Sequence, residues 1–424
     1  MSQLITLYSG QDLIPSRYND EGKGIPYITG ASNLENKRVI VNRWTESPTT
    51  HALQGDLLLT CKGSGVGKMA WCDIDDAHIA RQIMALRCIE GFLPDYLELV
   101  MSAMIASVKE KANGLIPGLS RDIVLDILTP TPPVNEQLRI VQSVEVILSL
   151  IDQVDRVKGE FKDTIRSTKS KILDLAIRGQ LVPQDPADEP ASVLLERIRA
   201  EKEELIKQGR IKRDKKESVI FRGEDNSYYL NEGQMTVDIS NNLPFTIPES
   251  WCWTRIKDVL IVNPRNKLED DLEVSFIPMT LIDDGYSGNH TAEVRKWKKV
   301  KTGFTHFAEG DIGLAKISPC FENRKSAVFT DLANGYGAGT TELHILRPLG
   351  KSILTHYLLA YVKSDCFVEG GKQTFTGDVG QQRISREYVE NAYFPLPPIK
   401  EQERIVQQIS TVFQFLDSIS DALS

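Results

Sequence analysis

Residues 130–142 read P-T-P-P-V-N-E-Q-L-R-I-V-Q, and residues 395–407 read P-L-P-P-I-K-E-Q-E-R-I-V-Q. Nine of the thirteen positions are identical, which chance does not explain. An internal repeat of this kind decides the architecture of a chain, because each copy is one structural unit. The sequence therefore predicts that the protein consists of two related halves.

Weaker similarities precede each copy of this motif in the same order. Duplication of a whole unit gives such an order, whereas one recurring helix-capping motif would not. Their spacing drifts between the halves, so we infer duplication followed by divergence in the loops. The corresponding segments are 26–28 with 275–277, 55–58 with 310–313, and 94–97 with 355–358.

The length and composition are those of a soluble protein with several domains. The chain has 424 residues, of which 41% are hydrophobic and 25% charged. At about 100 to 200 residues per domain, this predicts two or more domains with substantial cores. The formal net charge of -8 argues against a protein that coats nucleic acid through overall basicity. A local DNA-binding face remains compatible with this charge.

The cysteines, histidines and apolar segments indicate a cytoplasmic protein without metal. The six cysteines include no C-x-x-C pair, which is typical of reduced thiols. The six histidines show no zinc-ligand spacing, so we expect no metal site. No signal peptide and no apolar run of about 18 residues is visible. We therefore expect neither secretion nor a membrane span.

Each half is predicted to begin as a mixed α/β domain. Short apolar runs between turn signals predict strands, and one helix is expected within each domain. The expected strands are 25–28, 56–61 and 83–87 in the first half and 274–278, 311–317 and 343–346 in the second. The expected helices are 94–109 and 353–363.

A long helix is predicted to follow each Pro-x-Pro-Pro turn. The helix from about 134 to 178 would extend about 65 Å, which is too long to lie on one small domain. It needs a partner, and the helix of the second copy is the obvious one. The apolar seam of the first helix comprises Leu138, Val141, Val144, Leu148, Ile151, Val154, Phe161, Ile165, Ile172 and Leu175, and that of the second comprises Val406, Ile409, Phe413, Leu416 and Ile419.

The predicted fold class is α/β (α+β): two globular mixed domains joined by long antiparallel coiled-coil helices, with an internal pseudo-two-fold repeat. The second helix is shorter than the first, so the pairing covers only part of the first helix. A helical pattern resumes at 192–208, and 210–242 looks like a solvated connection. We expect domains at 1–132 and 243–397, a central helical region with linker at 133–242, and a closing helix at 398–424.

The glycine-rich segment G-S-G-V-G-K at 63–68 does not fit a nucleotide site. A Walker A loop needs glycine five residues before Gly67 and Ser or Thr after Lys68, but Lys62 and Met69 occupy those positions. The simplest interpretation of this segment is a flexible turn. An interpretation between a turn and a nucleotide site is a loop whose backbone approaches a DNA phosphate. No pattern for base methylation, hydrolysis or a paired-carboxylate nuclease is visible either. These absences favour a binding protein.

Basic and polar residues on predicted loops provide candidate DNA contacts. The run R-K-W-K-K-V-K at 295–301 places five cations around one aromatic residue in an acidic chain. Such runs are usually solvated surface, but within a DNA-binding domain they would contact phosphates. The candidate DNA-binding residues are Lys62, Ser64, Lys68, Arg81 and Arg121 in the first half and Lys298, Lys299, Lys316, Asn323, Arg324, Lys325 and Arg383 in the second.

The repeated motif also predicts a partner-docking surface. A glutamate in the first helical turn is explained by the helix dipole, but the recurrence of Gln and Arg-Ile-Val is not. We interpret these side chains as a surface that binds the same partner twice. The candidate docking residues are Glu136, Gln137, Arg139, Glu401, Gln402 and Arg404.

These features together resemble the specificity subunits of type I restriction-modification enzymes. The motif P-x-P-P-[VI]-x-E-Q-x-R-I-V closes an α/β domain and opens a long helix twice, as in that family. The stretch L-D-L-A-I-R-G-Q-L-V-P-Q-D-P at 173–186, followed by D-E-P-A at 188–191, is similar to the central conserved region of the family. The resemblance spans nearly the whole chain.

The resemblance implies a non-catalytic subunit. Each target-recognition domain would read one half of a split double-stranded DNA sequence, and the helices would set the gap as a ruler. Two methyltransferase subunits and the restriction (motor) subunits would dock on it. S-adenosylmethionine, ATP and magnesium would belong to those partners, so no cofactor is expected in this chain.

Two departures from the family pattern concern the ends of the units. The second unit opens with L-P at 243–244 and P-E-S-W-C-W at 248–253, as the family does, but the first has no counterpart, and the closing helix is short. These departures indicate either a trimmed gene product or termini whose missing parts another chain or subunit supplies. Two other interpretations remain open: an enzyme with an unrecognised active site, and a coiled-coil scaffold that binds only protein.

Overall fold

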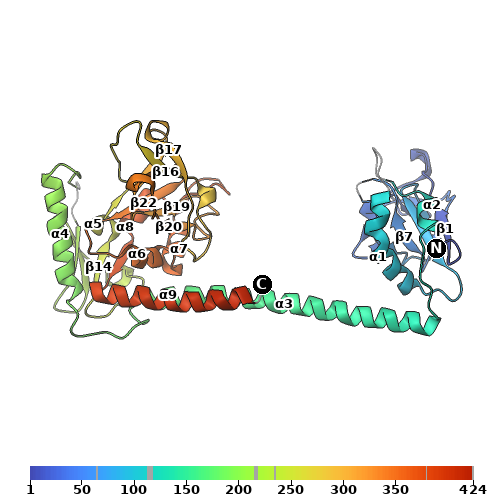
Figure 1. The fold of residues 1–424 in the computed structure, drawn as a ribbon, viewed down its shortest axis with the longest axis horizontal. Coiled ribbons are helices and arrows are strands. Elements are labelled where there is room, and N and C mark those ends of the chain that lie inside the picture. The colour runs from blue at the N-terminus through green and yellow to red at the C-terminus, as the bar shows by residue number, and fades with distance from the viewer. Residues whose placement is uncertain (64, 112–117, 214–217, 234, 379, 423–424) are drawn as a thin grey trace. The chain divides into compact units, whose positions relative to one another are not determined.

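The computed structural model describes residues 1–63, 65–111, 118–213, 218–233, 235–378 and 380–422, without side chains for 105–111 (Figure 1). The chain divides into two compact units, Met1–Val157 and Lys158–Ser424, called unit 1 and unit 2 below. Helix α3 (Val134–Ile177) belongs in part to each. Mixed strands and helices in each unit confirm the predicted fold class.

Unit 1 contains two four-stranded sheets that share a core. One has the strand order β1-β10-β7-β8, and the other has the order β5-β2-β9-β6, in which β2 and β9 are parallel. A small hairpin, β3 with β4, lies between β2 and β5 in the chain. The strands are β1 (Ile5–Ser9), β2 (Ile25–Ile28), β3 (Leu34–Glu35), β4 (Arg38–Val39), β5 (Trp44–Thr45), β6 (His51–Leu53), β7 (Leu57–Thr60), β8 (Met69–Trp71), β9 (Asp76–Ile79) and β10 (Ile83–Cys88).

Unit 2 repeats both sheets with the same topology. Its orders are β15-β22-β19-β20 and β17-β16-β21-β18, and β16 and β21 are again the parallel pair. This correspondence confirms the duplication that the repeated motif predicts. The strands are β15 (Leu260–Val262), β16 (Glu273–Ile277), β17 (Glu293–Lys296), β18 (Thr305–Ala308), β19 (Ile312–Ala315), β20 (Ser326–Val328), β21 (Tyr336–Gly339) and β22 (Leu343–Pro348).

A buried ion pair recurs at the same place in both units. Asp56 precedes β7 and accepts two hydrogen bonds of 2.8 Å from Arg87 of β10. Asp311 precedes β19 and accepts bonds of 2.8 and 2.7 Å from Arg347 of β22. Each aspartate also accepts from the backbone three residues earlier, which closes the turn at the preceding glycine. The weak similarity between 55–58 and 310–313 therefore reflects one conserved turn.

The helices largely follow the predicted ranges. Figure 1 shows α9 lying along α3 within unit 2. The start of α9 contacts the segment after α3, and Asp417 near its end pairs with Lys169, so the two helices are antiparallel. The other helices are α1 (Pro94–Lys111), α2 (Arg121–Leu125), α4 (Ala191–Lys207), α5 (Ile256–Val259), α6 (Thr355–Val362), α7 (Asp365–Lys372), α8 (Arg386–Asn391) and α9 (Ile399–Ala422).

The coiled-coil seam is buried only where α9 covers it. Within unit 2, Ile165 and Ile172 of α3 each expose 8% of their surface. Along the part of α3 that belongs to unit 1, Leu148, Ile151 and Val154 expose about half of theirs. The α3–α9 pairing therefore accounts for part of the apolar pattern of α3, as expected from the shorter second helix.

One expectation for the linker is wrong. Part of the stretch expected to be solvated forms an antiparallel sheet of β11 (Ser218–Arg222), β12 (Tyr228–Glu232) and β13 (Met235–Asp238). Ile220 and Leu230 bury one face of this sheet against Trp253. Trp253 lies on β14 (Cys252–Arg255), which pairs with β23 (Tyr393–Leu396). This sheet was not predicted because only one side of it is buried, so that the stretch has a polar composition overall.

Candidate nucleic-acid and partner interfaces

The glutamine of the first repeated motif has a structural role inside unit 1. Gln137 is fully buried, and its Oε1 accepts a hydrogen bond of 2.9 Å from the amide of Leu93. Its Nε2 donates to the carbonyl oxygens of Gly91 (3.1 Å) and Pro132 (2.9 Å). The side chain thus joins the start of α3 to the turn before α1.

The glutamine of the second motif makes the same three bonds. Gln402 is also fully buried; its Oε1 accepts from Leu354 (2.9 Å), and its Nε2 donates to Ser352 (3.3 Å) and Pro397 (3.1 Å). Buried polar groups need such partners. This explains why glutamine recurs and corrects the assignment of Gln137 and Gln402 to an exposed docking surface.

The glutamate and arginine of the second motif hold the segment that follows α3. Glu401 is buried and accepts from Trp251 Nε1 at 2.9 Å and from Gln184 Nε2. Burial raises the pKa of the Glu401 carboxyl, and these hydrogen bonds oppose the rise. Arg404 Nη2 lies 2.6 Å from the buried Asp188 carboxylate. Both residues are therefore engaged within unit 2.

The equivalent residues of the first motif are exposed. Glu136 and Arg139 lie on the first turns of α3, and within the described part of the chain neither has an ion-pair or hydrogen-bonded side-chain partner. The two copies of the motif thus differ in what they contact. Of the six residues predicted for docking, Glu136 and Arg139 are the two that are exposed and have no such partner among the described residues.

The candidate DNA contacts of unit 1 lie mostly in the loop between β7 and β8. Lys62 is exposed, while Lys68 donates to the carbonyl of Ala31 at 3.2 Å. Ser64 lies outside the described residues. Arg81 pairs with Asp12 at 2.7 Å, and Arg121 donates to the Leu7 carbonyl at 2.6 Å. Lys62 is therefore the candidate with the most freedom to contact a ligand.

A lysine in unit 2 repeats the contact of Lys68. Lys325 precedes β20 as Lys68 precedes β8, and its Nζ donates to the Met279 carbonyl at 3.1 Å. Both acceptors lie at the start of the short helical turn after the first strand of the parallel pair. This recurrence indicates that Lys68 and Lys325 brace a loop in each unit.

The basic run 295–301 is largely neutralised by neighbouring carboxylates. Lys296 and Lys298 lie 3.2 and 2.9 Å from the Asp271 carboxylate and lower its pKa, and Lys301 lies 2.8 Å from Asp270. Arg295 pairs with a glutamate two residues earlier. Within the described residues, Lys299 is the cation of this run without such a pair, while Trp297 is buried in the domain core.

The remaining candidates of unit 2 fall into two places. Lys316 lies beside Glu342, which Arg383 binds with two hydrogen bonds of 2.9 and 3.1 Å, and this arginine lowers the pKa of the Glu342 carboxyl. Asn323 and Arg324 lie on the loop before β20. Asn323 is exposed, but the Arg324 side chain is only 10% exposed and pairs with Asp365.

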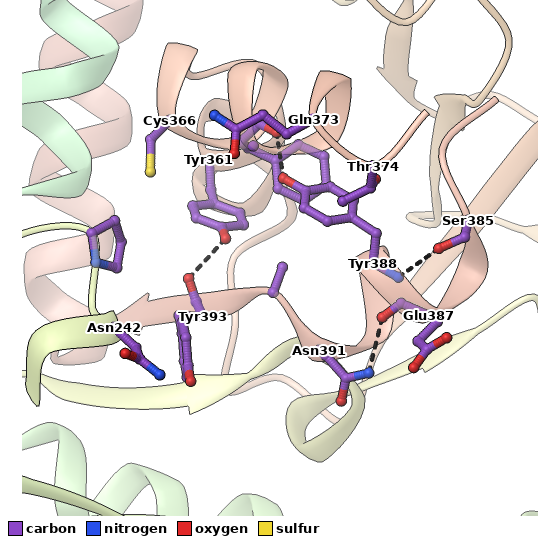
Figure 2. A pocket seen from close by; sticks show the side chains of 14 residues that line it. Asn242, Tyr361, Cys366, Gln373, Thr374, Ser385, Glu387, Tyr388, Asn391 and Tyr393 are labelled. Carbon is purple, nitrogen blue, oxygen red and sulfur yellow. Dashed lines mark hydrogen bonds between the residues drawn. The ribbon is translucent and has the colours of Figure 1, made fainter. Parts of the chain in front are cut away.

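A cavity of 680 Å³ lies between α7, α8 and the segment before β14. Figure 2 shows Tyr361 and Tyr388 on its wall and Ser385, Glu387 and Asn391 on α8 or at its start. Several of these polar groups bond within the protein: Tyr361 donates to the Tyr393 carbonyl at 2.8 Å, and Ser385 accepts from the Tyr388 amide at 3.0 Å. These bonds give the polar side chains on the cavity wall a structural role.

Other site types find no support in the described residues. No three His, Cys, Asp or Glu side chains gather there in a way that could hold a metal ion. Nor does any helix in the described ranges combine the length and the apolar character that crossing a bilayer requires.

Comparison with known proteins finds similarity to the specificity subunits of type I restriction enzymes. The type I restriction modification DNA specificity domain matches residues 248–423. The EcoAI and EcoEI type I restriction enzyme specificity subunits of Escherichia coli are 46% and 43% identical over 256 residues, which are 60% of this chain and 40% of each relative. The chain thus matches about two fifths of the length of these curated relatives.

Two solved structures share the fold over nearly the whole chain. The HsdS subunit from Thermoanaerobacter tengcongensis has a TM-score of 0.52 at 16% identity, covering 97% of this chain and 89% of that one. A chain from a study of complex assembly and conformational transition of the type I R-M system has a TM-score of 0.58 at 17% identity, covering 99% and 93%.

Proposed function

We propose that this chain is a specificity subunit of the type I restriction-modification family and that it selects a bipartite double-stranded DNA target for such a complex. The observation that carries this proposal is the duplication of one α/β unit with the same two sheets and the same closing motif. Two related units provide two related reading surfaces. Each would read one short block of sequence in its own half-site.

We propose that α3 separates the two reading surfaces. Its 44 residues give a contour of about 66 Å. A helical spacer between two groove-reading domains fixes the distance between half-sites in the same way as dimer geometry does. The domain ranges 1–132 and 243–397 are the proposed target-recognition domains, with 133–242 and 398–424 as the helical regions between and after them.

The proposed phosphate contacts are those candidate cations that are exposed and have no ion pair among the described residues. Lys62 in unit 1 and Lys299 in unit 2 are exposed and have no ion pair among the described residues. Lys298, Lys316, Asn323 and Arg383 remain secondary candidates because each is at least partly accessible. Phosphate contacts of this kind position a protein on DNA without reading its sequence.

The subunit is proposed to act without catalysis or a cofactor of its own. Methyltransferase subunits, two in number, and restriction subunits would dock on it and bring S-adenosylmethionine, ATP and magnesium. Glu136 and Arg139 are the proposed docking residues, because the same residues of the second motif already bind Gln184, Trp251 and Asp188 within unit 2.

The test is selection of duplexes from a random DNA library by the complex that this chain retains from its host. Two short blocks separated by a fixed gap are the expected result. A single block would contradict the bipartite target, and no enrichment would favour the scaffold interpretation. Methyl transfer to DNA by the purified chain alone would instead identify it as an enzyme.

A further inference from the structure

The loop between β16 and β17 in unit 2 contacts the α3–α9 pair. The ring of Tyr286 in this loop meets the ring of Phe413 on α9 edge-on, with centroids 5.9 Å apart. The guanidinium of Arg324 lies 5.2 Å from the centroid of the Tyr286 ring. Tyr286 thus joins a loop of the domain, a helix of the pair and a cation from a second loop.

Both backbone groups of the preceding residue, Gly285, are also held. Its amide donates to the Asn323 carbonyl at 2.7 Å, and its carbonyl accepts from Lys363 Nζ at 2.5 Å. Lys363 Nζ donates further to the Arg324 carbonyl at 2.8 Å, and Arg324 Nε donates to the Lys363 carbonyl at 2.9 Å. The two loops and the end of α6 are therefore joined by reciprocal bonds.

The same residues reach α3. Arg324 pairs with Asp365 at the start of α7, and Asp365 accepts a hydrogen bond from the hydroxyl of Ser170 on α3. We call Tyr286, Arg324, Lys363 and Asp365 the anchor cluster. Through it, loops of the domain contact both helices of the pair, and in Figure 1 the helices α6 and α7 lie between the sheets and α9.

Arg324 occupies a backbone position that the other unit gives to glycine. The Thr60 amide donates to the Lys68 carbonyl at 2.8 Å, and the Ala315 amide donates to the Lys325 carbonyl at 3.0 Å, so Arg324 corresponds to Gly67. Both are left-handed, with φ of +57° for Arg324 and +87° for Gly67. Glycine adopts this conformation readily, whereas a side chain makes it unfavourable.

Lys363 is likewise specific to unit 2. Counted from the leucines that bond to the two buried glutamines, it corresponds to Ser102. Its side chain is almost completely buried, and this burial lowers the pKa of its ammonium to about 7. Burial of an ammonium is unfavourable unless polar groups satisfy it. Unit 2 thus combines two energetically unfavourable features at one place: the left-handed backbone of Arg324 and the buried ammonium of Lys363.

We propose that Arg324 and Lys363 are positioning residues that fix the orientation of the second recognition domain on the α3–α9 pair, and thereby the gap at which this domain reads its half of the target. The part of the proposal that concerns the gap rests on the proposed function. The part that concerns orientation does not. Neither residue is assigned a contact with DNA, because both side chains are buried.

The first test measures orientation without DNA. Spin labels at the exposed positions Thr302 and Gln408 of the full chain report the distances between the recognition domain and α9. Arg324→Gly suits the left-handed backbone, so the domain should fold while the distance distribution broadens. Lys363→Met should give the same result. An unchanged width in both folded variants would overturn the proposal.

A matched control uses another cation on the same side of the domain. Lys372 on α7 is partly exposed and pairs with Glu369 on its own helix. Lys372→Ala should therefore keep the width of the unsubstituted chain. If the distance distribution also broadened in this control, any change of charge would loosen the domain. That result would contradict a specific role of the anchor cluster.

The second test measures the gap in the assembled complex. Duplexes with the selected blocks and gaps shortened or lengthened by single base pairs should show that Arg324→Gly weakens the preference for the best gap about tenfold. Arg324→Lys keeps the charge opposite Asp365 and should restore part of the preference. Equal loss of affinity at every gap, or an unchanged preference, would overturn the inference. If the unsubstituted complex shows no preferred gap, the proposed function fails. The distances between the spin labels then still test whether the anchor cluster fixes the orientation of the domain.

Discussion

The two buried glutamines are the residues that most clearly connect sequence to structure. Gln137 and Gln402 make equivalent hydrogen bonds to a leucine amide and two carbonyl groups, one of them five residues earlier in the chain. A single amide side chain therefore fixes the angle at which each long helix leaves its domain. The recurrence was visible in the sequence, but its cause was not, because two of the three partners of each glutamine lie more than 40 residues away.

Removal of one of these amides should destabilise its unit. Gln402→Ala removes the partner of three backbone groups, one of them buried and two partly buried, and we expect a loss of about 3 kcal/mol in the free energy of unfolding of unit 2. Urea unfolding followed by tryptophan fluorescence measures this loss. The neighbouring exposed Glu403→Ala serves as the control and should change stability by less than about 0.5 kcal/mol. A loss below about 1 kcal/mol for Gln402→Ala would contradict the structural role.

A buried histidine should make stability depend on pH. Burial on β22 lowers the pKa of His344 from 6.5 to about 4. The unfolded chain then binds a proton that the folded chain does not bind between pH 6.5 and 4, so this residue costs about 3 kcal/mol of stability as the pH falls through that window. Unfolding of His344→Gln at several pH values should show a flatter profile than that of the unsubstituted chain.

The control for this profile is a core substitution on the same strand that does not titrate. Ile345 is fully buried, and Ile345→Val should lower stability by about 1 kcal/mol while the slope with pH stays unchanged. If His344→Gln retained the full slope, other groups would account for the acid sensitivity.

At the scale of elements, the α3–α9 pairing makes one helix serve two environments. The seam residue Ile172 is buried within unit 2, while Val154 of the same seam is about half exposed. Ile172→Ala should cost about 3 kcal/mol and Val154→Ala less than about 1 kcal/mol in urea unfolding. Equal effects would mean that something other than α9 determines the burial of the seam.

The two copies of the repeated motif should respond differently to the same substitution. Arg404→Ala leaves the buried Asp188 carboxylate without its partner and should cost about 2 kcal/mol of unit 2 stability, allowing for the partial exposure of the arginine. Arg139→Ala should leave stability within about 0.5 kcal/mol but lower the yield of co-purified methyltransferase subunits. An undiminished yield would contradict the docking role of Arg139.

Much of the element order could be predicted from sequence because it depends on local periodicity. The strands at 25–28 and 343–346 and the helices α1, α3 and α4 appear where the apolar spacing places them. The β11–β13 sheet was missed because its short strands lie in a stretch that is rich in charged and polar residues, such as 210–217 and 223–227. The site residues were less predictable: Arg324 is engaged inside the fold by loops and helices that only the tertiary structure brings together.

At the scale of the whole molecule, Lys62 and Lys299 are the candidate DNA contacts that are exposed and have no ion pair among the described residues. Lys62→Ala and Lys299→Ala should each reduce the dependence of binding on salt by about one unit of logarithmic slope, with the selected sequence unchanged. Titration of the complex on its selected duplex at several salt concentrations measures this slope. Lys298→Ala provides a comparison, since its ion pair with Asp271 predicts a smaller change. A changed base preference would contradict the assignment of Lys62 or Lys299 to phosphates.

Each α/β unit is proposed to read its own block of a split target. The most direct measurement replaces residues 1–132 with the matching domain of a relative of different specificity and repeats the selection from a random library with the assembled complex. We expect a new first block, with the second block and the gap unchanged. A selection in which both blocks change, or neither does, would contradict it.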